Sequence, residues 1–197
     1  MAPRLFLTGV PAVGKTSIAG SPRLPHERVA TAEFGRYMLD AGLRRGEIDS
    51  LEQLKAASPA LRARLQSDAV ERINDESSTM PLIIDGHLIV ATRVGFVPGI
   101  PPEQIDALQL SAIVIIRATS ADILLRRNAR PEKYSSSAMN NGDSIDLHDE
   151  LTRAAALFYS LSKAVPISVV WNHQEKLDGA INDFMRVGCE TIRELCE

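Results

Sequence analysis

The sequence is poor in cysteine and in aromatic residues. Its 197 residues include two cysteines, one tryptophan, three tyrosines and five phenylalanines. Cys189 and Cys196 lie near the C-terminus at a spacing typical of one helix face, and two such thiols provide neither a disulfide framework nor a zinc site. We therefore expect two free thiols on or near one helix face.

Long apolar runs and an excess of positive charge are also missing. No apolar stretch approaches the roughly 20 residues of a membrane-spanning helix. The first apolar run, 5–7, is too short for the core of a signal peptide, so we expect a cytoplasmic protein with no membrane partner. The net charge of -3 argues against binding nucleic acid through a broad basic surface, and we expect no nucleic-acid partner.

What is present is the composition of an ordinary globular protein. Hydrophobic residues make up 45% of the chain and charged residues 24%. The length suits one full domain, so we treat 1–197 as a single unit.

Short, continuous apolar runs alternate with helical segments along this chain. The strand candidates are 4–8, 28–32, 81–85, 111–117 and 166–171. Helices are predicted from about residue 15, over 34–43 and over 58–74. Continuous apolar strands are typical of a sheet covered on both faces, so the alternation predicts a parallel, three-layer α/β fold.

Two C-terminal helices are predicted from apolar stripes at spacings of three and four. The first stripe contains Leu147, Leu151, Ala154, Phe158 and Leu161, and we expect it to dock its helix against the rest of the protein, which places Arg153 near the other arginines. The second contains Leu177, Ile181, Phe184, Gly188, Ile192 and Leu195. Residues 86–103 are expected to form a structured loop because of their glycines and prolines, and the composition of 130–144 suits a mobile surface loop.

The most specific motif follows the first strand. Residues 9–16 read G-V-P-A-V-G-K-T and match G-x-x-x-x-G-K-[ST] at every fixed position. Glycines let backbone N–H groups turn toward a phosphate, and the helix that begins near Lys15 adds the positive end of its dipole. We predict that the phosphates of ATP are bound by Gly9, Pro11, Ala12, Val13, Gly14, Lys15, Thr16 and Ser17.

A metal site is predicted beside this phosphate-binding loop (the P-loop). Asp85 closes the buried strand 81–85, where a carboxylate can hold Mg²⁺ together with the hydroxyl of Thr16. The alternative role for Asp85 is that of a turn or helix cap. The residue after Asp85 is Gly86 and not a glutamate that could activate water, which favours phosphate transfer over hydrolysis. No Asn-Lys-x-Asp motif for guanine is present, so a GTPase is not expected.

Several segments in order along the chain resemble the archaeal-type adenylate kinases, a branch of the nucleoside monophosphate kinases. They are 8–16, 33–38, 83–87, 95–101, 124–127 and 148–156. The resemblance implies a P-loop NTPase fold with a five-stranded parallel sheet, an insertion at about 33–75 that binds a monophosphate, and a lid at about 126–146. It also implies Mg²⁺-dependent conversion of ATP and AMP to two ADP, and a homo-oligomer, in that branch a trimer.

Three departures from the family pattern concern the acceptor and the lid. The stretch between Lys15 and Glu33 is shorter than usual, Gly86 stands where the family often has threonine, and 128–134 lacks the arginine-rich lid sequence. Two other functions therefore stay open. One is a P-loop kinase with another nucleotide or a small alcohol as acceptor, and the other is a nucleotide-switched binding protein with weak turnover.

Transfer of a phosphoryl group requires positive charge around it. Besides Lys15, we predict catalytic roles for Arg126, Arg127 and Arg153, and a role in the lid for Arg130. The alternative is that these arginines are solvated residues near a helix C-terminus.

The acceptor site is expected to lie beyond the second strand and beyond Asp85. The base of an acceptor nucleotide requires an apolar slot, and its phosphate requires arginines. The candidates are Phe34, Gly35, Arg36, Met38, His87 and Arg93. In the resemblance, Trp171-Asn172-His173 borders the base of ATP, with a packed tryptophan and a polar loop as the alternative.

Overall fold

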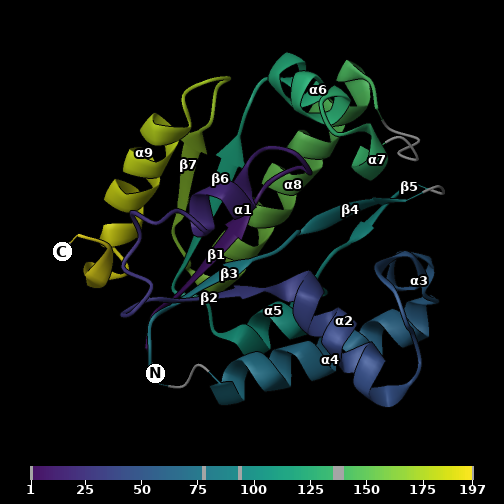
Figure 1. The fold of residues 1–197 in the computed structure, drawn as a ribbon. Helices are drawn as coiled ribbons and strands as arrows, with labels where there is room; N and C mark the ends of the chain where they lie inside the picture. The colour runs from purple at the N-terminus through teal and green to yellow at the C-terminus, as the bar shows by residue number, and fades with distance from the viewer. Residues whose placement is uncertain (1, 77–78, 93–94, 135–139, 197) are drawn as a thin grey trace.

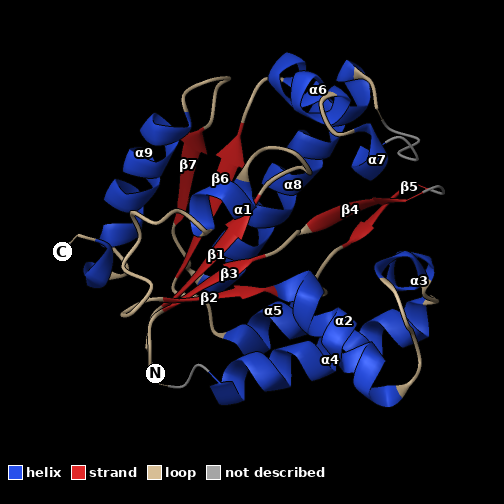
Figure 2. Ribbon diagram, viewed as in Figure 1, coloured by secondary structure: helices blue, strands red, loops and turns tan. Residues whose placement is uncertain are grey.

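The computed structural model describes residues 2–76, 79–92, 95–134 and 140–196, and it contains the predicted parallel sheet. Its strands are β1 (Arg4–Thr8), β2 (Ala30–Glu33), β3 (Leu82–Asp85), β6 (Ala112–Arg117) and β7 (Ile167–Trp171), in the order β2-β3-β1-β6-β7 (Figure 1, Figure 2). Every neighbouring pair is parallel, so the predicted five-stranded α/β sheet is confirmed.

Helices cover both faces of this sheet. The helices α2 (Phe34–Arg45), α4 (Pro59–Glu76), α5 (Pro102–Leu108) and α8 (Gly142–Lys163) contribute to one core, which includes Phe6 of β1. The helices α1 (Lys15–Ala19) and α9 (Leu177–Cys189) contribute to the other, which includes Leu5 and Leu7. Alternate side chains of each inner strand thus enter opposite cores, which explains why the strands are apolar throughout.

Two predicted loops contain regular structure. Strands β4 (Ile89–Thr92) and β5 (Gly95–Pro98) form an antiparallel hairpin inside 86–103, and α5 follows it, so the loop prediction was wrong there. The predicted surface loop 130–144 includes α7 (Pro131–Tyr134) and the start of α8, while 135–139 lie outside the described residues. Figure 1 shows the hairpin between α6 (Ser120–Asn128) with α7 on one side and α2 with α3 (Leu51–Ala56) on the other.

The apolar stripe predicted for α8 faces solvent, not the core. Leu161 is 78% exposed, Phe158 is 67% exposed and Leu147 is 46% exposed. The inner face of α8 instead consists of Ile145, His148, Thr152, Ala156 and Tyr159, all buried. The prediction was wrong because two polar side chains on the inner face find backbone partners: His148 bonds to the Ile89 carbonyl oxygen, and the Thr152 hydroxyl donates to the His148 carbonyl oxygen.

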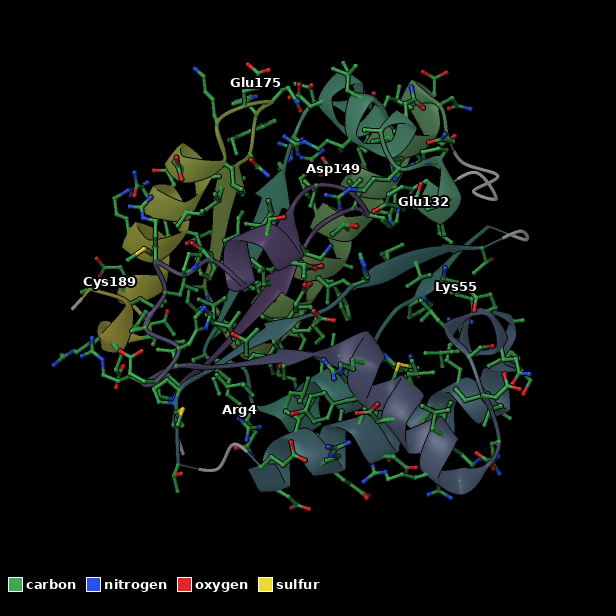
Figure 3. All side chains as sticks on the ribbon, in the orientation of Figure 1. Arg4, Lys55, Glu132, Asp149, Glu175 and Cys189 are labelled. Carbon is green, nitrogen blue, oxygen red and sulfur yellow. A yellow bond between two sulfur atoms is a disulfide. The ribbon has the colours of Figure 1, made fainter. Side chains whose placement is uncertain are left out.

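The C-terminal helix is shorter than predicted, and its cysteines are paired. The helix α9 ends at Cys189, and the short helical turn η1 (Arg193–Leu195) folds back against it. Cys189 and Cys196 form a disulfide with their Cα atoms 5.4 Å apart, which corrects the expectation of free thiols (Figure 3). Seven residues would be two turns of a continuous helix, but the chain reverses between the two cysteines. Ile192 and Leu195 are still buried as expected, through this reversal.

The described part of the chain contains no helix with both the length and the apolar character that a bilayer crossing requires.

Candidate active site

The P-loop joins the central strand β1 to α1 in a backbone shape that glycine favours. The φ angle is 145° at Gly9, 74° at Ala12 and 103° at Gly14, all in the region that L side chains rarely adopt. A Cβ atom on Gly9 would lie 2.3 Å from the Ile116 carbonyl oxygen, so this position must be glycine. The first turn of α1 carries N–H groups without partners inside the helix, and groups of this kind can donate to a phosphate.

Lys15 and Thr16 lie where the motif requires them. The buried Lys15 ammonium donates to the Gly9 carbonyl oxygen at 3.0 Å, so its side chain folds back over the loop. The Thr16 hydroxyl donates to the Asp85 carboxylate at 2.9 Å. Because β1 and β3 are paired with Leu7 opposite Asp85, the carboxylate reaches the start of the loop.

These two side chains fit a magnesium ion. A hydroxyl and a carboxylate are hard oxygen ligands, and Mg²⁺ in phosphotransferases takes its other ligands from water and phosphate. Among the described residues there is no group of three or more His, Cys, Asp or Glu side chains that could hold a metal ion.

Two of the predicted catalytic arginines contact the P-loop directly. Arg126 donates to the Val13 carbonyl oxygen at 3.1 Å and to the Asn172 carbonyl oxygen at 2.7 Å. Arg127, which is buried, donates to the Pro11 carbonyl oxygen at 3.1 Å. Burial lowers the pKa of both guanidinium groups from its ordinary value.

The other two arginines of the prediction lie apart from the loop carbonyls. Arg153 is exposed and pairs with Asp149 at 3.2 Å, one turn away on α8 (Figure 3). Asp149 also binds Arg117 at 2.6 Å, and Arg117 closes β6 beside the P-loop strand. Arg130 is exposed after the end of α6.

The predicted acceptor residues divide into buried and exposed groups. Phe34 and Met38 are buried and belong to the core on the α2 side of the sheet. Gly35 and Arg36 are exposed, and a Cβ atom on Gly35 would meet no atom within 4 Å. Arg93 lies outside the described residues. Gly35 and Arg36 are therefore the members of this set that present accessible atoms beyond β2.

His87 points at the P-loop. Its Nδ1 lies 3.0 Å from the Gly9 carbonyl oxygen, and because a carbonyl only accepts, Nδ1 carries the proton. Burial, followed by the charge of Lys15 and by His148, holds the pKa of His87 well below its ordinary value, so the ring is neutral at pH 7. Its predicted contact with the acceptor stays a prediction.

An aromatic site opens at the end of β7. A hollow of about 590 Å³ is lined by residues that include Thr119, Trp171, His173 and Lys176. The rings of Trp171 and His173 are stacked at 5.4 Å, and the Arg117 guanidinium lies 4.5 Å from the centre of the Trp171 ring. A flat, partly exposed indole of this kind can stack on a nucleobase.

Sequence reasoning missed Arg117, Asp149 and His148. Arg117 and Asp149 lie 32 residues apart and meet only through the packing of α8 at the end of β6. His148 joins α8 to the hairpin, through its bond to Ile89 at 3.0 Å and a tilted contact with the Phe96 ring at 5.2 Å. One available signal was that Arg117 ends a strand next to that of the P-loop, where ligands of α/β sheets bind.

Comparisons with known proteins agree with this geometry. The family described as "AAA domain" matches residues 8–146. The chain is 31% identical to the adenylate kinase of Thermococcus onnurineus over 185 residues, which is 93% of each protein. It is 29% identical to that of Pyrococcus abyssi over 195 residues, 96% of this chain and 97% of the relative. The solved shikimate kinase of Bacteroides thetaiotaomicron superposes with a TM-score of 0.57 at 15% identity, covering 94% of this chain and 97% of that one, and it shows the fold alone.

Because φ is positive at Ala12, we expect two substitutions of this residue to change the affinity for Mg-ATP differently. Ala12→Val places a β-branched side chain at φ 74°, so we expect the dissociation constant of Mg-ATP to rise about tenfold. Ala12→Gly is the matched control, because glycine adopts this angle freely and should bind Mg-ATP like the wild type. Calorimetric titration measures both, and equal binding by the valine variant would contradict the assigned backbone shape.

His148 predicts a loss of stability in acid. Burial is the main cause that lowers its pKa, and the charges of Arg127 and Lys15 add to it against the opposing effects of Ile89 and Asp149. In acid the unfolded chain therefore binds a proton that the folded chain excludes. As the pH is lowered below about 6.5, the pKa of histidine in the unfolded chain, the free energy of unfolding should decrease, by at most about 1.4 kcal/mol per pH unit for this group. His87 adds in the same direction.

Urea unfolding between pH 7 and pH 5 measures this effect. His148→Gln can keep a donor toward Ile89 but does not titrate, so its stability should depend less steeply on pH than that of the wild type. Parallel curves for the two proteins would show that His148 does not titrate on unfolding.

Proposed function

The chain belongs to the adenylate kinases within the P-loop family described as AAA domain, and we propose that it transfers the γ-phosphate of ATP to AMP, giving two ADP. The observation that carries the proposal is a closed P-loop whose Lys15 is buried and whose Thr16 contacts Asp85. This arrangement provides donors, a cation and metal ligands for a triphosphate, and the residue after Asp85 is a glycine and not a glutamate that could activate water.

Each part of the site has a role in the proposed reaction. The N–H groups of the P-loop and Lys15 bind the β- and γ-phosphates, and Thr16 with Asp85 holds Mg²⁺. When bound, the metal neutralises charge on the phosphates. Arg126, Arg127 and Arg153 are proposed to stabilise charge on the transferred group, and Arg130 to close over it from the lid. This assignment requires Arg126 and Arg127 to exchange carbonyl partners for phosphate oxygens.

The two nucleotides are proposed to approach from opposite sides of the P-loop. The base of ATP stacks in the hollow at Trp171 and His173, and AMP lies beyond β2 against Gly35 and Arg36. Exposure of Gly35 and Arg36 supports this placement, since an acceptor phosphate needs an accessible arginine. His87, Phe34, Met38 and Arg93 complete the proposed acceptor set.

We also propose that copies of the chain associate through α8. Its apolar residues 147, 151, 154, 158 and 161 recur at alternating spacings of four and three, and all of them are exposed except residue 151, which is half-buried. This is the repeat of a helix that packs against another helix along a narrow seam. Exposed apolar rows of this length are uncommon on monomers, which supports a homo-oligomer.

Loss of the P-loop ammonium should abolish most phosphate transfer. We expect Lys15→Ala to lower the turnover of ATP with AMP on the order of a hundredfold or more, because it removes a charge that stabilises the transition state. A coupled assay of ADP formation measures it. Lys163→Ala is the matched control, since this surface lysine pairs with Asp106 at the far end of α8 and should leave turnover unchanged.

The same assay with a panel of monophosphates tests the acceptor. Selective formation of ADP with AMP supports the proposal. If transfer to another nucleotide or to a small alcohol is faster, that molecule and not AMP is the acceptor. If the protein binds ATP but transfers phosphate to no acceptor, the proposed kinase activity is refuted.

Association through α8 predicts a mass above that of one 21.5 kDa chain. Light scattering after gel filtration should show the oligomer for the wild type, and the variant Phe158→Glu should shift the mass toward the monomer because it buries a charge in the seam. Leu43→Glu is the control, since Leu43 is also exposed but lies on α2. A wild-type monomer would refute this interface.

A further inference from the structure

The carbonyl groups of the P-loop need hydrogen-bond donors, just as its N–H groups need an acceptor. When successive N–H groups of a loop converge on a phosphate, some of the neighbouring carbonyl groups point away from it. A buried carbonyl without a donor costs about as much as a lost hydrogen bond, so these oxygens also need partners. In this chain the carbonyl oxygens of Gly9, Pro11 and Val13, every second residue, all receive side-chain donors.

The Gly9 oxygen receives two donors of different kinds. Lys15 donates its ammonium at 3.0 Å and His87 donates Nδ1–H at 3.0 Å. In the proposed reaction Lys15 must turn toward the phosphates of ATP. His87 lies on a separate element, just after the end of β3, and can keep its bond to the same oxygen while Lys15 moves.

The Val13 oxygen repeats this arrangement at the other end of the loop. Arg126 donates to it at 3.1 Å, and the side-chain amide of Asn172 donates at 2.8 Å. Asn172 is buried, and its own N–H donates to the Arg117 carbonyl oxygen at 2.7 Å, which fixes it at the end of β7. Its amide nitrogen lies 2.2 Å from where a Cβ atom on Gly14 would be, so Gly14 leaves the space that the amide occupies.

Each end of the loop therefore has one cationic donor and one second side-chain donor from a distant element. We propose that His87 and Asn172 are positioning residues that hold the Gly9 and Val13 carbonyls outward when Lys15 and Arg126 leave them for the nucleotide. The inference rests on the proposed function, because the movement of the cations belongs to ATP binding. It assigns a role in the affinity for ATP to a histidine predicted for the acceptor site, and to an asparagine whose segment the resemblance places only beside the base of ATP.

The test measures binding of Mg-ATP by calorimetry, without turnover. Asn172→Leu has a similar volume but no donor, and we expect it to raise the dissociation constant of Mg-ATP about tenfold, the usual effect of one lost buried hydrogen bond. His87→Leu should do the same. His87→Asn should restore binding to within about threefold of the wild type, because the asparagine amide can take the place of Nδ1–H.

A stability control separates positioning from general damage. Asn74 accepts a bond from the buried Arg4 and donates to the Ala107 carbonyl oxygen at 3.1 Å, at the end of the sheet opposite the P-loop. Asn74→Ala should lower the melting temperature and leave the affinity for Mg-ATP unchanged. If Asn74→Ala weakens binding in proportion to its loss of stability, the inference is overturned.

Two further outcomes would count against the inference. Wild-type affinity in folded Asn172→Leu and His87→Leu overturns it, and equal loss in His87→Leu and His87→Asn overturns the role of the hydrogen bond. If Asn172→Leu does not fold, the comparison of the two His87 variants decides between these outcomes. A wild-type protein that binds Mg-ATP but does not phosphorylate AMP refutes the proposed function and leaves this binding test intact.

Discussion

The site depends on one constraint, which is that the backbone of residues 9–16 must present N–H groups inward and carbonyl groups outward. The inward N–H groups are required to bind a phosphate, and the outward carbonyl groups are required to find donors in the buried surroundings of the loop. Positive φ angles at Gly9, Ala12 and Gly14 create the turn. Lys15 of the loop donates to the Gly9 oxygen, but the side-chain donors to the Pro11 and Val13 oxygens come from elements far away in sequence.

The parallel sheet meets this requirement through its order and register. The strand that carries the P-loop is central, with β3 on one side and β6 on the other. Asp85 ends β3 next to Thr16, and Arg117 ends β6 next to Asn172. Because all carboxyl ends lie at one edge, residues at the ends of β3 and β7 reach the same loop, as expected for ligand sites of α/β folds.

The sequence predicted the parts of this structure that follow from local rules. Continuous apolar runs identified all five strands of the main sheet, and the glycine spacing identified the P-loop, because both patterns are contained in a few neighbouring residues. The hairpin of β4 and β5 was missed since its glycines and prolines also suit a loop. The outer stripe of α8 was assigned inward because sequence alone could not show that His148 and Thr152 have backbone partners in the core. The disulfide was missed because it depends on a chain reversal after Cys189.

The partners of the arginines suggest why a site can hold so much positive charge before ATP binds. Arg126 and Arg127 donate to peptide carbonyl oxygens of the P-loop, and burial lowers the pKa of both. A peptide dipole satisfies a guanidinium less well than a phosphate does, because a bond between two ions is stronger than one between an ion and a neutral group. Exchange of these carbonyls for phosphate oxygens is therefore favourable, provided that the carbonyls are not left without donors. His87 and Asn172 meet that condition for the Gly9 and Val13 carbonyls, so the two ends of the loop can keep one backbone geometry in the empty and the occupied site.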